Sequence, residues 1–224
     1  FSAALGLATG VLAVVFLSEP GERDAGPPRP GRFDALRAAV LGPEAPWYWT
    51  TFAVMFGASS TFATLVYFVE EHLGGTQRDA SVAFAAFGGA SALTQGLVVG
   101  RVVRRWGEAP TVAAALVLGA CGFGALWGAR GVGQVHAGIA FVALGMALSR
   151  PTVTSLVSRR SALGQGSAMG VQAAFDSLGR MLGPLWAGWL YGLNPTAPYL
   201  SAACVYGLGL LAVARAREAR PHGR

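Results

Sequence analysis

The fold of this chain is decided by the stretch Gly170–Gly192, which reads GVQAAFDSLGRMLGPLWAGWLYG. It is long and apolar enough to cross a membrane, because a helical span needs about 20 residues at a rise of about 1.5 Å each. It also carries Gln172, Asp176 and Arg180, whose i, i+4, i+8 spacing puts them on one helix face. An aspartate or arginine near the bilayer centre costs about 2.5–3.5 kcal/mol, so we expect these residues to be retained for a purpose.

The composition indicates a membrane protein. Of the 224 residues, 53% are hydrophobic and 12% are charged, about half the charged share of ordinary soluble domains. The net charge of +6 comes from arginine alone, and the arginines lie between apolar runs. Membrane orientation explains this placement better than nucleic-acid binding does, so we expect no nucleic-acid partner. Both cysteines lie inside apolar runs and suggest no disulfide framework.

Seven apolar runs follow one another along the chain. We interpret the first, Ser2–Leu17, as the end of a helix whose start is missing, so the sequence is expected to be the C-terminal part of a longer protein. The six further spans are predicted at Trp47–Phe68, Val82–Val103, Pro110–Trp127, Val135–Val157, Gly164–Leu190 and Ala197–Ala214. The runs are too long for strands and do not alternate, and their short connections favour antiparallel helices.

This division predicts a truncated transmembrane helix, a central cytoplasmic linker, a six-helix transmembrane bundle and a basic cytoplasmic tail, at residues 1–18, 19–46, 47–215 and 216–224. The linker contains an amphipathic run, Phe33–Leu41, which suits a short helix on the membrane surface and equally a solvated turn. Trp47, Tyr48 and Trp49 are interpreted as an interfacial aromatic belt at the start of the next span.

The arginines provide an independent test of the division. Their counts in successive connections and in the tail are 4, 1, 3, 1, 2, 0 and 4. By the positive-inside rule, the arginine-rich connections and the C-terminus face the cytoplasm. Apart from Arg101 near the end of Val82–Val103, which is counted with the following connection, only Arg150 and Arg180 lie within predicted spans.

Asp176 and Arg180 allow two interpretations. They could form a substrate or proton site facing a water-filled cavity, where protonation of Asp176 releases Arg180 as a free cation and biases a conformational equilibrium. They could instead form a structural ion pair that neutralises itself inside the bundle. We favour the functional interpretation and predict that Asp176→Asn abolishes proton-coupled transport while the protein still inserts.

Other polar residues within spans are weaker candidates. Pro151 predicts a helix kink, and Arg150 beside it could hold an anionic group, cap freed carbonyls or extend to the interface. Further candidates for lining a cavity, which could instead bond to their own helix backbone, are Ser59, Ser60, Thr61, Thr94 and Gln95.

Two stripes of small residues, Ala120–Gly124–Gly128 and Gly188–Gly192, are expected to pack helices closely. The three histidines are placed in loops and the tail without metal-ligand spacing. The chain lacks the GxSxG, HExxH and CxxC motifs, so we predict neither an enzyme nor a bound metal or cofactor.

The run Gln95–Glu108 resembles the loop motif of the major facilitator superfamily, roughly G-x-x-x-D-R-x-G-R-R, in its second-half copy. The matching residues are Gly96, Arg101, Arg104 and Arg105, whereas Gly100 and Val103 replace the acid and the second glycine. The ending Trp106–Glu108 is more specifically similar to tetracycline-resistance-type drug:proton antiporters. Three further runs resemble the seventh, tenth and eleventh helices of such proteins: Thr61–Ala63 with Glu70, Arg150–Arg159 and Ser177–Pro184.

This resemblance implies an all-α membrane protein, the six-helix C-terminal half of a twelve-helix major facilitator fold with the end of the preceding helix. Gly183 and Pro184 would form a turn that corresponds to one in the fifth helix. The implied function is proton-coupled efflux of small amphipathic compounds by alternating access, with the N-terminal half as partner and the bacterial inner membrane as location. The alternatives are an importer or sugar-type facilitator, and a helical membrane scaffold that does not transport.

Overall fold

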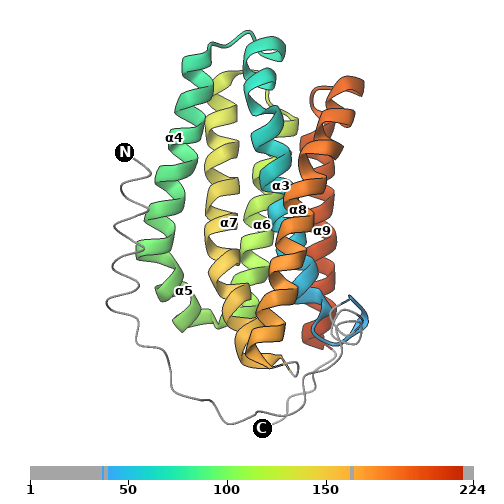
Figure 1. Ribbon diagram of the computed structural model, residues 1–224. Coiled ribbons are helices and arrows are strands. Elements are labelled where there is room, and N and C mark those ends of the chain that lie inside the picture. Colours follow the sequence, from blue (N-terminus) through green and yellow to red (C-terminus); the bar gives the residue numbers. More distant parts are fainter. Residues whose placement is uncertain (1–36, 38–39, 162–163, 219–224) are drawn as a thin grey trace, which may run out of the picture.

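The computed structural model describes residues 37, 40–161 and 164–218, and in this part of the chain the regular structure is entirely helical. The predicted helix at residues 1–18, residues 19–36, 38 and 39 of the linker and residues 219–224 of the tail lie outside the described residues. The six predicted spans are all present as helices, which run alongside one another as a bundle (Figure 1).

The helices extend beyond the predicted spans at most of their ends. The first is α3 with a π-helical end, η1, and the second consists of α4, the π-helical η2 and α5. Their bounds are α3 Ala45–Tyr67, η1 Phe68–His72, α4 Gln77–Leu93, η2 Thr94–Val98, α5 Val99–Trp106, α6 Glu108–Trp127, α7 Val132–Arg160, α8 Gln165–Leu193 and α9 Ala197–Glu218. The last helix begins at the predicted Ala197, whereas the predicted connection of residues 104–109 shrinks to Gly107 alone.

Local sequence explains several helix ends. Pro46 stands in the first turn of α3, where its missing N–H leaves no helical bond unmade. Thr76 and Asp79 form a capping box at the start of α4, with each side chain accepting from the other residue's backbone N–H. Gly107 and Gly164 adopt φ values of +82° and +76°, which glycine reaches without steric cost, at the starts of α6 and α8.

The bundle is held by two closely packed pairs, α6 with α7 and α3 with α8. The glycines that allow this approach are mostly not the predicted ones. On α8 a Cβ at Gly179 or Gly183 would lie 2.7 or 2.8 Å from a backbone carbonyl oxygen of α3. The stripe predicted from Gly188 and Gly192 packs against none of the described helices, because nothing in the described structure lies within 4 Å of a Cβ built there.

The stripe predicted on α6 is also displaced. Gly124 faces open space within the described structure, while a Cβ at Gly122 would lie 2.7 Å from the backbone nitrogen of Val142 on α7. On α8 the packed glycines keep the predicted spacing of four residues on another face, whereas on α6 the closely packed glycines, Gly119 and Gly122, are three residues apart. Only packing against a neighbour distinguishes one small-residue stripe from another, since both follow the helical period.

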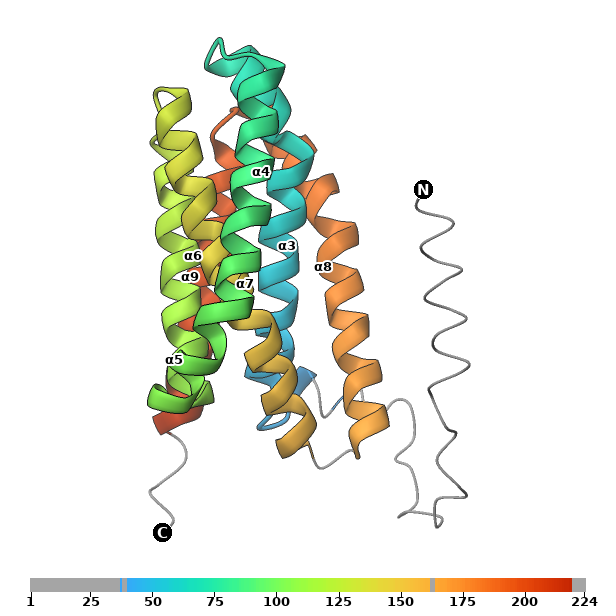
Figure 2. The same ribbon diagram turned by 90° about the vertical axis from the view of Figure 1, so that its left-hand side faces the viewer.

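The ends of the helices divide into two sets. Figures 1 and 2 show the ends of α5, α7 and α9 and the start of α8 at one end of the bundle, with the α3–α4, α6–α7 and α8–α9 connections at the other. The helix ends that carry several arginines therefore gather at a single end, as the alternating counts predicted. Five helical segments are long and apolar enough to cross a membrane: Ala45–His72, Gln77–Trp106, Glu108–Trp127, Val132–Arg159 and Ala197–Ala216.

The sixth helix, α8, has 29 residues but is not among these five, because polar residues interrupt its apolar run. It nevertheless lies along α3 in both views (Figures 1 and 2). Its buried stripe, which faces the bundle, consists of Ala168, Gln172, Phe175, Gly179, Gly183 and Ala187. The opposite side of α8 exposes large apolar side chains, as expected of a helix that contacts lipid or another helical unit.

Two further interpretations need correction. Trp47 and Tyr48 are 3% and 0% exposed, so of the predicted aromatic belt only Trp49 reaches the surface. His72 and His136 were placed in loops, but they belong to η1 and α7, and the His136 imidazole lies 3.1 Å from the Asp79 carbonyl oxygen. The third histidine, His222, lies outside the described residues.

Candidate functional site

A small polar cavity lies where α3, α7 and α8 meet. Its volume of about 40 Å³ has room for a few water molecules. The residues that line it are Thr51, Val54 and Met55 from α3, Ser149, Arg150, Val153 and Thr154 from α7, and Gln172 and Asp176 from α8. Two residues predicted on α8 and one on α7 are thus brought together by the fold.

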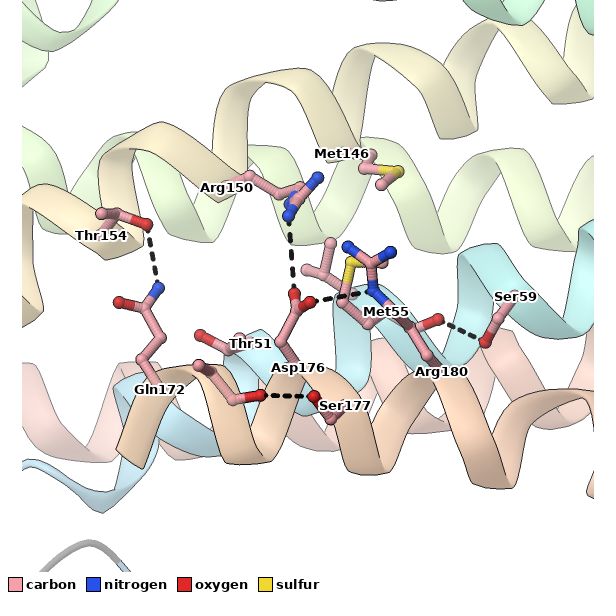
Figure 3. Close-up of polar contacts among 12 residues, drawn as sticks. Thr51, Met55, Ser59, Met146, Arg150, Thr154, Gln172, Asp176, Ser177 and Arg180 are labelled. Atoms are coloured by element: carbon pink, nitrogen blue, oxygen red, sulfur yellow. Dashed lines mark hydrogen bonds and ion pairs between the residues drawn. The ribbon is translucent and has the colours of Figure 1, made fainter. Parts of the chain in front are cut away.

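Asp176 lies between two arginines, as Figure 3 shows. Its Oδ2 atom accepts a hydrogen bond of 2.9 Å from Nε of Arg180, one turn further along α8. Its Oδ1 atom lies 3.6 Å from Nη2 of Arg150 on α7. The side chain of Asp176 is 20% exposed, and those of Arg150 and Arg180 are 47% and 55% exposed. One carboxylate against two guanidinium groups leaves the cluster with a net charge of +1.

Gln172 is the most deeply buried polar member of the site. It is 8% exposed, and its Nε2 atom donates a hydrogen bond of 2.9 Å to Thr154 Oγ1 on α7 (Figure 3). Its Oε1 atom is buried and accepts no hydrogen bond from any described residue. A buried amide oxygen normally accepts a hydrogen bond, so a ligand or water in the cavity could donate one to this atom.

Gln95, the other glutamine predicted to border the cavity, does not reach it. It lies exposed in η2 and is not a lining residue. All four hydroxyl candidates bond to backbone carbonyls, but only Thr61, Thr94 and Ser59 bond to their own helix as the alternative interpretation anticipated, while Ser60 and also Ser59 bond across to α8. These bonds run from Thr61 to Gly57, from Thr94 to Ala90, from Ser60 to Gly183, and from Ser59 to both Met55 and Gly179.

The residues of the predicted loop motif lie far along the chain from this cavity. Gly96 is exposed in η2 and has open space around it within the described structure. Arg101 donates to the Leu97 carbonyl of its own helix, and Arg104 and Arg105 are exposed at the end of α5. None of them lines the cavity.

The two prolines lie within helices. α7 is assigned as one helix through Pro151, so the predicted kink stays a prediction. Pro184 lies inside α8, where Gly183 beside it packs against α3, so these two residues form no turn.

Sequence reasoning missed Thr51, Ser149 and Thr154. Thr154 follows Arg150 by four residues and so shares its helix face, a spacing that could have been noticed. Ser149 and Thr51 bond to their own helix backbones and carry no comparable signal. Among the described residues, no three His, Cys, Asp or Glu side chains are grouped as metal ligands.

A bundle with five membrane-length helices beside a cavity lined by charged residues is typical of helical membrane proteins with a polar pathway. The profile of the Major Facilitator Superfamily matches residues 1–164 and 47–224 of this chain. The chain belongs to the major facilitator superfamily, a family of secondary transporters embedded in membranes.

Curated relatives include two proteins of Bacillus subtilis. Multidrug resistance protein 1 is 26% identical over 94% of this chain and 54% of its own length, and multidrug resistance protein 2 is 29% identical over 72% and 41%. The quinolone resistance protein NorA of Staphylococcus aureus is 24% identical over 95% of this chain and 55% of its own length. The chain therefore spans about half the length of the curated relatives it matches.

Solved structures with a similar fold include crystal structures of the peptide transporter POT. A mutant form superposes with a TM-score of 0.70 at 22% identity, covering 85% of this chain and 42% of the other. The form in complex with sulfate gives 0.70 at 23% identity, over 84% and 42%. At this identity the likeness concerns the fold alone: six helices that make up about half of a transporter.

Proposed function

We propose that this chain is the C-terminal half of a secondary transporter that exports small amphipathic compounds in exchange for protons. The observation that carries the proposal is the position of Asp176, whose carboxylate borders a polar cavity between two arginines within membrane-length helices. An ionisable residue at such a place is retained for function more often than for stability. The names of the curated relatives, which describe multidrug and quinolone resistance, support efflux rather than uptake.

The mechanism follows from the charges that face Asp176. Arg150 approaches from α7 and Arg180 from its own helix, while α3 contributes the uncharged Thr51, Val54 and Met55. Protonation of Asp176 removes the negative charge that attracts both guanidinium groups, which weakens the link between α7 and α8. Such a local change can bias the rocking of two halves about a shared site, the alternating-access motion.

The arrangement in the membrane is part of the proposal. The arginine-rich end of the bundle, with the C-terminus, faces the cytoplasm of a bacterial inner membrane. Residues 1–18 and 19–46 supply the end of the preceding helix and the central linker, and residues 47–215 are the bundle. A first half completes the protein and contributes the other wall of the substrate site.

The test is flux of a lipophilic dye in inside-out vesicles that contain the protein expressed from its own gene, with and without a pH gradient. We expect dye uptake that stops when a protonophore collapses the gradient. Flux without dependence on the gradient would favour a facilitator. If the chain is a non-transporting scaffold, the original protein shows no flux, and the double variant Asp176→Leu with Arg180→Leu still folds and inserts. If it is a transporter, the original protein shows flux and the double variant loses it.

A further inference from the structure

The polar residues of α8 form an ordered array. Gln172, Asp176 and Arg180 follow one another at steps of four residues, or about 6 Å along the helix. From the arginine-rich end of the bundle inward, the array presents an acceptor without a donor, a carboxylate and a guanidinium. The complementary molecule presents a donor, or a positive charge, and a negative charge in the same order.

At the Gln172 end of this array, two oxygen atoms can accept a further hydrogen bond. Gln172 Oε1 is buried and accepts no hydrogen bond from the described residues. Among the described residues, Asp176 Oδ1 has only the contact of 3.6 Å with Arg150, which is beyond the range of a strong charge-assisted hydrogen bond. A carboxylate has about four lone-pair sites, so Asp176 can accept further. The cavity between these atoms, at about 40 Å³, has room for an ammonium group but not for an apolar ring system.

The other end of the array is open to an acceptor. Arg180 uses Nε for Asp176, and its side chain is 55% exposed. The Nη atoms of a guanidinium form the fork that binds carboxylate or phosphate oxygens in pairs. The net charge of +1 in the cluster of Arg150, Asp176 and Arg180 favours a ligand that brings a negative charge as well as a donor.

We propose that this site recognises an amphipathic zwitterion. Its ammonium group enters the cavity between Gln172 and Asp176, its anionic group binds the fork of Arg180, and its apolar body stays outside the cavity along α7 and α8. This assignment rests on the proposed function, which it deepens: an ammonium on Asp176 takes the place of the exchanged proton. Molecules with only one of the two charges satisfy only one end of the array.

The experiment uses four fluorescent probes with the same aromatic body. Dansyl-lysine linked through its side chain carries an ammonium and a carboxylate, dansylcadaverine only an ammonium, dansylglycine only a carboxylate, and dansylamide neither. Each is titrated against the protein expressed from its own gene and purified in detergent. We expect dansyl-lysine to bind about tenfold more tightly than either singly charged probe.

Two variants separate the ends of the array. Arg180→Gln should reduce the affinity for dansyl-lysine and dansylglycine about tenfold and should not weaken dansylcadaverine, because the lost guanidinium repels an ammonium group. Gln172→Leu should weaken dansyl-lysine and dansylcadaverine and leave dansylglycine unchanged. The matched control is Ser177→Ala on the exposed face of α8, where the hydroxyl bonds only to the Ala173 carbonyl.

Equal binding of dansylamide and dansyl-lysine overturns the proposal, because the cavity then holds water rather than a ligand group. If Gln172→Leu does not fold, the test rests on Arg180→Gln at the exposed position: unchanged affinity of this variant for dansyl-lysine then overturns the proposal. The proposed function fails separately: selective binding without proton-driven flux contradicts transport, while flux of a dye without zwitterion preference contradicts only this inference.

Discussion

The guanidinium of Arg150 on α7 and the carboxylate of Asp176 on α8 approach to 3.6 Å across the polar cavity. This contact joins two helices that pack mainly against other partners, α7 against α6 and α8 against α3. Asp176 also binds Arg180 at 2.9 Å, so one carboxylate contacts an arginine from each of the two helices. The proposed effect of protonating Asp176 on the link between α7 and α8 rests on this pair of contacts.

Replacement of Asp176 by Asn should abolish proton-coupled flux. The amide keeps the size of the side chain but cannot take up and release a proton, and it leaves Arg150 and Arg180 without a counter-ion. Flux driven by a pH gradient in vesicles measures the effect, with membrane insertion checked by blotting of the membrane fraction. Asp176→Glu retains a carboxylate and should restore part of the flux. Full flux in the Asn variant contradicts the proton role.

Replacement of Gly183 by Ala should destabilise the packing of α8 on α3. The added Cβ would lie 2.8 Å from the Phe56 carbonyl oxygen, and a backbone atom cannot move aside cheaply. Overpacking of this kind costs about 1–3 kcal/mol. The control is Gly188→Ala on the same helix, with open space in the described structure, where Ala should be neutral or gain about 0.5–1 kcal/mol. Thermal unfolding in detergent compares the two.

Loss of the capping box should loosen the start of α4. Thr76 Oγ1 accepts from the Asp79 N–H, and the Thr76 N–H donates to Asp79 Oδ2 at 2.8 Å. Thr76→Ala removes the side-chain acceptor and should cost about 1 kcal/mol. Hydrogen exchange of the first turn of α4 should speed up, while Thr76→Ser should resemble the original protein. Unchanged exchange in the Ala variant means that tertiary contacts alone hold this end.

Labelling of single cysteines should place the helix ends on two sides of the membrane. In a background without Cys121 and Cys204, cysteines at Arg104 and Arg159 should react from the cytoplasmic side, and one at Arg78 from the other side. The reason is that α5 and α7 end together, opposite the start of α4 (Figure 1). The measurement compares labelling of each cysteine by a membrane-impermeant maleimide in intact cells and in inside-out vesicles. Opposite reactivity of Arg104 and Arg159 contradicts the orientation.

Within the described residues the sequence predicted all six helices in order, and for five of them the reason is that a membrane span is a local property. About 20 apolar residues suffice to define one, whatever lies beside them. The i, i+4 spacing likewise determined that Asp176 could pair with Arg180 on α8. Helix ends were less accurate, since polar caps such as Thr76 and Asp79 extend a helix past its apolar run.

Contacts between helices depended on the tertiary structure, because helical periodicity says which residues share a face but not which neighbour that face meets. The pairing of Arg150 with Asp176, the hydrogen bond from Gln172 to Thr154 and the exclusion of Gln95 from the cavity all required the packing of α3, α7 and α8. The same holds for Gly183, whose closeness to α3 no pattern of small residues distinguishes from the open position of Gly188.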